Sequence, residues 1–184
     1  DTLFIESTYG DRRHKSLDES IGEFKEAIVS TLKKNGNVLI PSFALERTQE
    51  ILWLLHEMHD NGELPKCQVF LDSPLAIKAT KLYNQYTAHL SDEVQYRPGS
   101  GRDPFSFSWL EPITSRDQSI AINDVKKKAI IIAGSGMCNG GRIVHHLKHR
   151  LWNPKNAIIF VGFQVEGTLG RSIIDGEDSV KVYG

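Results

Sequence analysis

The chain has 184 residues, of which 40% are hydrophobic and 24% are charged, so it can bury one substantial core but is too short for two domains. Its formal net charge of -1 gives no general attraction to a polyanion, so nucleic-acid binding would depend on local basic clusters. The sequence has no apolar run as long as a membrane span and no signal peptide, so we expect a cytoplasmic protein without a membrane partner. Cys67 and Cys138 lack a metal-type spacing and are expected in the core.

The first segment of the chain predicts a strand, a loop and a helix. Residues 1–5 form a short apolar run, and a chain that starts directly on a strand is expected to belong to something longer. A helix is predicted after Ser16, because Glu19 three residues later completes a capping box. Asn35 and Gly36 suit the left-handed conformation that ends a helix.

Two strand–turn–helix units follow. Residues 38–40 predict a buried strand that Pro41 ends, and Ser42 is predicted to cap the next helix. Residues 69–71 predict a second buried strand, and Pro74 suits the first position of the helix after it.

The middle of the chain has weaker signals. Pro98 and Gly101 are typical of a loop, alternation over 105–110 predicts a short strand, and 115–123 predict a short helix. The three lysines at 126–128 are interpreted as a solvated entry to the next strand rather than as a binding patch.

The clearest unit lies at 129–150, where an apolar strand leads through a glycine-rich turn into a helix that begins near Arg142. A strand at 157–161, a turn and a short helix to about Ile174 repeat the pattern, and 179–183 predict a last strand. Alternating strands and helices predict an α/β fold, a Rossmann-like domain with a mostly parallel sheet flanked by helices.

Right-handed crossovers should bring all the strand-end turns to the carboxyl edge of the sheet, where such sheets bind ligands. Arg47, Arg142 and Arg171 each lie near a predicted helix start, where backbone N–H groups favour an anion. Three guanidinium groups along one edge could hold successive phosphates. The alternative is that each arginine pairs with a nearby carboxylate (Glu46, Glu50 or Glu166).

Several other kinds of site are disfavoured by spacing. The central turn misses the dinucleotide fingerprint G-x-G-x-x-G by one position, where Asn139 stands. Seven histidines are present, yet none forms a zinc-binding H-x-H-x-D-H or H-E-x-x-H motif, so we expect no metal site made by this chain alone. Ser42 and Ser73 follow strands but lack the G-x-S-x-G elbow of a nucleophilic serine.

Five segments in order give the chain a family resemblance: 6–12, 40–50, 72–76, 134–142 and 162–171. Together they closely resemble the β-CASP domain of metallo-β-lactamase-fold RNA nucleases, the group that includes RNase J, the pre-mRNA 3′-end cleavage endonuclease and bacterial and archaeal RNA-metabolising metallohydrolases. The resemblance covers essentially the whole chain. We therefore expect residues 1–184 to be a single β-CASP domain from a larger protein, whose metallo-β-lactamase domain is not in this chain.

The resemblance implies that the parent protein is a zinc-dependent ribonuclease. Its metallo-β-lactamase domain would bind two zinc ions, this domain would cover them, and single-stranded RNA would lie in the cleft between. The isolated chain is then expected to bind no zinc and to be inactive. Two alternatives are a stand-alone Rossmann-like module for a nucleotide or phosphosugar and an inactive scaffold relative. Whether the parent forms a homodimer is left open.

The same resemblance suggests roles for individual residues. Glu6 matches the acidic residue that orients a general-acid histidine, and that histidine is absent from this chain. The residues expected to contact substrate at the strand-end turns are Ser7, Thr8, Tyr9, Ser42, Arg47, Ser73, Gly136, Arg142, Gln164, Gly167, Thr168 and Arg171.

Overall fold

A five-stranded parallel sheet forms the centre of the computed structural model, which describes residues 1–11, 13–92, 94 and 103–182. The strands lie in the order β3-β2-β4-β1-β5, so the central strand β4 pairs with both β2 and β1. Their bounds are β1 Val38–Pro41, β2 Gln68–Asp72, β3 Leu110–Pro112, β4 Ala129–Ala133 and β5 Ala157–Ile158. The predicted α/β fold is confirmed.

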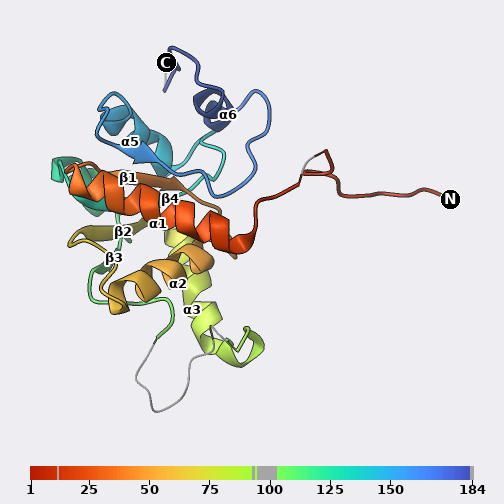
Figure 1. Ribbon diagram of the computed structural model, residues 1–184, viewed down its shortest axis with the longest axis horizontal. Coiled ribbons are helices and arrows are strands. Elements are labelled where there is room, and N and C mark those ends of the chain that lie inside the picture. The colour runs from red at the N-terminus through yellow and green to blue at the C-terminus, as the bar shows by residue number, and fades with distance from the viewer. Residues whose placement is uncertain (12, 93, 95–102, 183–184) are drawn as a thin grey trace.

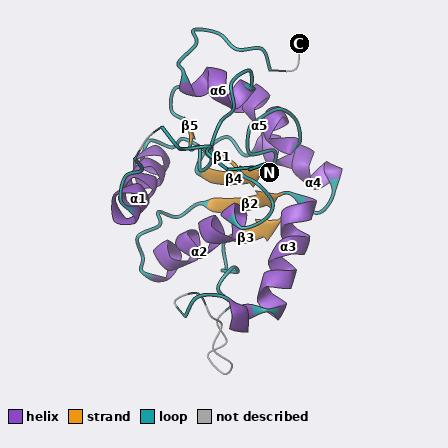
Figure 2. Ribbon diagram, turned by 90° about the vertical axis from the view of Figure 1, so that its right-hand side faces the viewer, coloured by secondary structure: helices purple, strands orange, loops and turns teal. Residues whose placement is uncertain are grey.

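Helices cover both faces of this sheet (Figures 1 and 2). Their bounds are α1 Leu17–Lys33, α2 Arg47–Asp60, α3 Pro74–Gln85, α4 Arg116–Ala121, α5 Arg142–Arg150 and α6 Leu169–Ile174, with short 3₁₀ turns η1 Thr87–His89 and η2 Ile122–Asp124. No helix in the described ranges is long and apolar enough to cross a membrane.

Strand β4 shows why both faces need a cover. Its five residues are buried, and successive side chains point to opposite faces. Ile130 and Ile132 pack with residues of α1, α2 and α3, whereas Ile131 packs with Ile122 of η2 on the other face. Ala133 contacts the cluster formed by α5 and α6. A continuous apolar run is therefore the expected pattern for a parallel strand between two helical layers.

Several helix ends agree with the predictions made from the sequence. The Ser16 hydroxyl accepts from the Glu19 N–H (3.2 Å), and the Glu19 carboxylate accepts from the Ser16 N–H (2.9 Å), so the capping box is confirmed. Asn35 has the predicted left-handed φ of 60°. Ser73 caps α3, and Pro74 occupies its first position.

Both cysteines are buried, as predicted. Burial raises the pKa of the Cys67 thiol and of the Cys138 thiol to about 12, so both stay protonated at neutral pH. A protonated thiol is a poor nucleophile, which agrees with a packing role.

Two predictions near the first helices were wrong. Residues 1–5 form no strand, and Leu3, Phe4 and Ile5 are exposed on an arm that extends away from the sheet (Figure 1). A strand needs a hydrogen-bonding neighbour, and this arm has none in the described part of the chain. Ser42 does not cap α2, which begins at Arg47; instead its buried hydroxyl accepts a hydrogen bond from the Thr48 hydroxyl (3.0 Å).

Strand lengths after residue 100 also differ from the prediction. The strand expected over 105–110 begins only at Leu110, because Phe105 and Phe107 are buried in the core outside the ladder. The strand expected over 157–161 ends at Ile158. Residues 179–182 form no strand, and Tyr183 lies outside the described residues, as do Pro98 and Gly101 of the predicted loop.

Candidate functional site

Four turns meet at the carboxyl edge of the sheet, each directly after a strand, as the parallel arrangement requires. They are residues 42–46 after β1, Ser73 after β2, residues 134–141 after β4 and residues 159–168 after β5. Figure 2 views the molecule from the side on which the N-terminal arm projects. The prediction that the strand-end turns share one edge is borne out by the topology.

The glycine-rich turn after β4 folds tightly back on itself before α5. The Ser135 N–H donates to the Gly140 carbonyl (3.1 Å), and the Ile143 N–H donates to the Gly134 carbonyl (3.0 Å). Gly141 has φ 75° and ψ -173°, and a Cβ there would lie 2.4 Å from the Gly134 oxygen. Only glycine suits this position. The tight turn places Arg142 at the first position of α5, as predicted.

Three of the four turns are held together by direct contacts. The Phe43 ring lies over Gly136, where a Cβ would be only 2.6 Å from a ring carbon. The Gln164 Nε2 donates to the Gly136 carbonyl (2.9 Å), and the Gly170 N–H donates to the Met137 carbonyl (3.2 Å). These contacts make the turns after β1, β4 and β5 one packed unit.

Asp72, the last residue of β2, joins the fourth turn to this unit. Its carboxylate is fully buried and accepts from the Arg142 guanidinium at Oδ1 (2.6 Å). At Oδ2 it meets His146 Nε2 and the Ser119 hydroxyl, each at 2.6 Å. Burial alone would raise the pKa of Asp72, but the hydrogen bonds from His146, Ser119 and Arg142 outweigh burial and hold it below its usual value.

This cluster fixes the direction of the Arg142 side chain, which also donates to the Ile113 carbonyl (3.2 Å) and remains 24% exposed. An arginine held by a buried carboxylate loses little conformational freedom when it binds a second anion. Sequence reasoning missed Asp72, Ser119 and His146. The available signal was a carboxylate at the end of a buried apolar strand, where an unpaired charge would be costly.

Arg47 and Arg171 also have carboxylate partners, but on the surface. Arg47 pairs with Glu50 (2.5 Å), one of the predicted alternatives, and Arg171 makes two hydrogen bonds to Asp175 (2.8 and 2.6 Å). Exposed pairs of this kind contribute only about 0–1 kcal/mol, so a phosphate can displace the carboxylate. Arg47 lines a groove of about 1140 Å³ along α1 and α2, whereas Arg142 and Arg171 do not. A single cleft shared by all three stays a prediction.

The other residues predicted at the turns have visible local roles. Ser73 and Thr168 cap α3 and α6, and Thr168 is buried. Gln164 is 3% exposed and supports the neighbouring turns, and Gly136 is buried under Phe43. Gly167 is exposed with φ 78°. Contact of these residues with a substrate stays a prediction.

The predicted residues on the N-terminal arm, 6–9, approach the edge at one point. The Tyr9 ring packs edge-on against Phe163 in the turn after β5, with ring centroids 5.2 Å apart. Further out, Glu6 accepts from the Thr8 N–H (2.6 Å), and hydrogen bonds from the Thr8 side chain and backbone lower the pKa of Glu6. The Glu6 carboxylate is therefore charged at neutral pH.

The residues present do not fit the zinc ions that the sequence resemblance implies. In the described ranges no group of three or more His, Cys, Asp or Glu side chains is arranged to hold a metal ion. The buried Asp72–His146 pair is occupied by a guanidinium, whose positive charge opposes a second cation. We therefore derive no chemical step through a metal on this chain.

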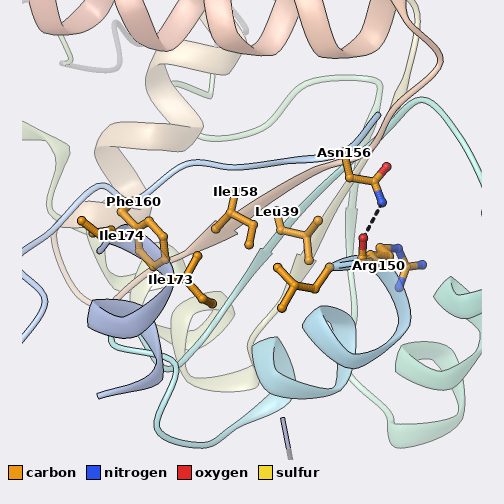
Figure 3. Close-up of a pocket in the computed structure, with 8 residues that line it drawn as sticks. Leu39, Arg150, Asn156, Ile158, Phe160, Ile173 and Ile174 are labelled. Atoms are coloured by element: carbon orange, nitrogen blue, oxygen red, sulfur yellow. Dashed lines mark hydrogen bonds between the residues drawn. The ribbon is translucent and has the colours of Figure 1, made fainter. Parts of the chain in front are cut away.

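A separate cavity of about 390 Å³ lies between β5, α5 and α6 (Figure 3). Leu39, Ile158, Phe160 and Ile173 give it an aliphatic and aromatic lining. Arg150 contributes its backbone, whose carbonyl accepts from Asn156 (2.9 Å), while its guanidinium points away and donates to the carbonyl of η2 residue 122. The cavity offers no charged group to an anion.

A parallel α/β sheet with packed strand-end turns and arginines at helix starts defines a Rossmann-like domain with its ligand edge at the strand carboxyl ends. The model of the Beta-Casp domain family matches residues 48–173, and the chain belongs to this family. The resemblance drawn from the sequence is confirmed.

Three relatives are informative. Over its whole length the chain is 43% identical to Ribonuclease TTHA0252 of Thermus thermophilus and spans 42% of that protein. It is 39% identical to Transcription termination factor FttA of Lokiarchaeum sp., with 95% of the chain and 28% of that protein aligned. It is 34% identical to an RNase J-like protein of Methanocaldococcus jannaschii, with 100% of the chain and 42% of that protein aligned. The chain thus spans less than half the length of these relatives.

Proposed function

We propose that this chain is the RNA-binding β-CASP domain of a metal-dependent ribonuclease, whose zinc ions are held by a metallo-β-lactamase domain outside these residues. Family membership and the ribonuclease among the relatives support the proposal. The observation that carries it is the carboxyl edge, where four turns are packed together and a buried carboxylate orients Arg142.

The edge offers arginine side chains as phosphate ligands. Helix α2 begins without a side-chain cap, but its Arg47 N–H donates to the Leu45 carbonyl (2.8 Å), so the side chains and not this helix start carry the proposal. Arg47 and Arg171 can exchange their surface carboxylates for phosphate oxygens, and Arg142 is already oriented. Phosphates carry no base identity, so this edge would hold RNA in register without reading its sequence.

Replacing Arg47 or Arg171 with alanine in the full-length protein should weaken single-stranded RNA binding by about 1.5–3 kcal/mol, the range for hydrogen bonds to charged groups. The loss should be similar for different sequences. The slope of log affinity against log salt should fall by roughly 0.7 per lost contact. Fluorescence anisotropy over a salt series measures both quantities.

Glu50→Gln and Asp175→Asn are the matched controls, because they remove the partner and keep the arginine. Both should bind RNA as well as or better than wild type. An alanine variant with an unchanged salt slope would show that its arginine touches no phosphate.

Glu6→Gln in the full-length protein should slow single-turnover RNA cleavage by about 10–100-fold, the usual effect of losing a group that orients a site residue. Glutamine keeps the size and one acceptor of Glu6 but lacks the charge that would stabilise an imidazolium. Bound metal, measured by mass spectrometry, should not change. Glu23→Gln removes an exposed carboxylate on α1 and serves as the control. Full activity of Glu6→Gln would remove its assigned role.

A further inference from the structure

The opposite edge of the sheet, where the strands begin, gathers exposed lysines from five segments of the chain. This side lies on the left in Figure 1, where α1 ends, away from the N-terminal arm. We call the following residues the lysine rim: Lys34, Lys66, Lys127, Lys128, Lys148 and Lys155.

Asn37, at the start of β1, ties three of these segments together. Its side-chain oxygen accepts from the Ala129 N–H (3.1 Å), and its side-chain nitrogen donates to the Lys126 carbonyl (3.1 Å). Its own N–H donates to the Asn156 side chain (2.8 Å). Asn37 is 2% exposed, so a buried amide positions the loops before β1, β4 and β5.

Backbone contacts also join the segments that carry the rim lysines. The Lys128 N–H donates to the Gly36 carbonyl (2.9 Å), and the Lys128 carbonyl accepts from Gln68 at the start of β2 (3.0 Å). Gly36 lies so close to the Lys155 carbonyl that a Cβ would be 1.9 Å from its oxygen. The starts of four neighbouring strands are therefore in contact, and at about 4.8 Å per strand they extend over roughly 14 Å.

The positive charge of the rim is not neutralised locally. No rim lysine pairs with a carboxylate within residues 1–11, 13–92, 94 and 103–182. The exposed Asp124 of η2 is close in sequence to Lys127 and Lys128 but forms no ion pair with either of these two lysines. The pKa of His149 is lowered by burial and then by the charges of Arg150, His146, Lys148 and Lys126, which agrees with a positive field at the end of α5.

An exposed aromatic residue adjoins this field. Trp152, just after α5, is 77% exposed, and its indole N–H donates to the His149 carbonyl (3.0 Å), which holds the side chain in place. Lysines beside an exposed aromatic ring match single-stranded nucleic acid, because phosphates pair with the ammonium groups and a base stacks on the ring. An acidic protein surface would form ion pairs with the lysines but would not use the exposed indole ring of Trp152.

We propose that the lysine rim and Trp152 form a second binding surface for single-stranded RNA, on the side of the domain opposite the carboxyl edge. The inference rests on the proposed function in taking RNA as the ligand. A five-residue strand is roughly 17 Å long, so a very short RNA can occupy only one edge, whereas a long RNA can reach both. Oligonucleotide length therefore separates the two surfaces.

The test uses the full-length protein and uridine oligonucleotides of four and thirty nucleotides, with binding followed by anisotropy. Lys148→Gln/Lys155→Gln should weaken binding of the long RNA by roughly 25-fold near 0.1 M salt and lower the salt slope by about 1.4, as expected for two phosphate contacts. Affinity for the short RNA and its cleavage should not change. Trp152→Ala should weaken long-RNA binding with no change in slope.

Lys78→Gln/Lys81→Gln, which removes the same charge from exposed positions on α3, is the matched control and should bind both RNAs like wild type. The proposal that the rim binds RNA would be overturned if the rim and control variants lost equal affinity. It would also be overturned if the rim variant lost equal affinity for both RNAs. If the wild-type protein binds both RNAs and the rim variant binds the long RNA equally well, the second surface is overturned, whereas the proposed function still stands. A wild-type protein that binds neither RNA would overturn both proposals.

Discussion

Asp72→Asn is expected to lower the free energy of unfolding by about 3–5 kcal/mol, the usual cost of removing one partner of a buried charge pair. The carboxylate is fully buried and accepts from Arg142, His146 and Ser119. Asparagine has the same size but only one acceptor, so at least one of these donors loses its partner. Urea denaturation at pH 7, followed by circular dichroism, measures the change.

The pH dependence gives a second readout of the same cluster. The pKa of Asp72 in the folded state lies below its usual value of 3.8, so its stabilising effect is present above that pH and is lost as the pH falls through the folded-state pKa. The difference between wild type and Asp72→Asn should therefore shrink below about pH 4. Asp175→Asn, which breaks a surface pair with Arg171, should cost at most about 1 kcal/mol. An Asp72→Asn difference as large at pH 3 as at pH 7 would mean that the carboxylate charge is not the cause.

Gly141→Ala is expected to destabilise the domain by about 2–6 kcal/mol and to disorder the central turn. Its φ of 75° and ψ of -173° fall in a region that is nearly restricted to glycine, which costs another residue about 1–3 kcal/mol. The new Cβ would also lie 2.4 Å from the Gly134 oxygen, and such overlap costs about 1–3 kcal/mol. Thermal denaturation should show a midpoint lower by roughly 4–24 °C.

The adjacent Gly140→Ala is the control, because a Cβ at Gly140 would meet no atom within 4 Å. This variant should stay within about 0.5 kcal/mol of wild type. Equal stability of the two variants would contradict the packing assigned to the turn. Since the turn positions Arg142, Gly141→Ala should also weaken RNA binding at a temperature where the protein remains folded.

The features of this fold that were predicted correctly depend on neighbours in sequence. Ser16 and Glu19 form their capping box within one helical turn, and Pro74 follows its cap directly. The apolar run of β4 predicts burial on both faces whatever packs against it. The wrong predictions depended on partners that the fold supplies. Residues 1–5 have no strand to pair with in the described part of the chain, and the Ser42 hydroxyl accepts from Thr48, six residues further on, instead of capping a helix.

For the candidate site, the sequence alone determined that arginines stand at the starts of α2 and α5 and near the start of α6, and its ordered motifs determined the family. Only the tertiary structure decided how Arg142 is held, because the groups that share Asp72 come from 47, 70 and 74 residues further along the chain.

For the lysine rim, too, the sequence determined one part and the tertiary structure decided the other. The sequence pattern of the three lysines at 126–128 indicates a solvated strand entry. The fold places Lys34 in a loop that contacts them and Lys155 in a loop that contacts Gly36 and Asn37. Parallel strands joined by crossovers align all their starts at one edge and all their ends at the other. The sequence fixes which residues precede and follow each strand, but only the order β3-β2-β4-β1-β5 decides which of them become neighbours.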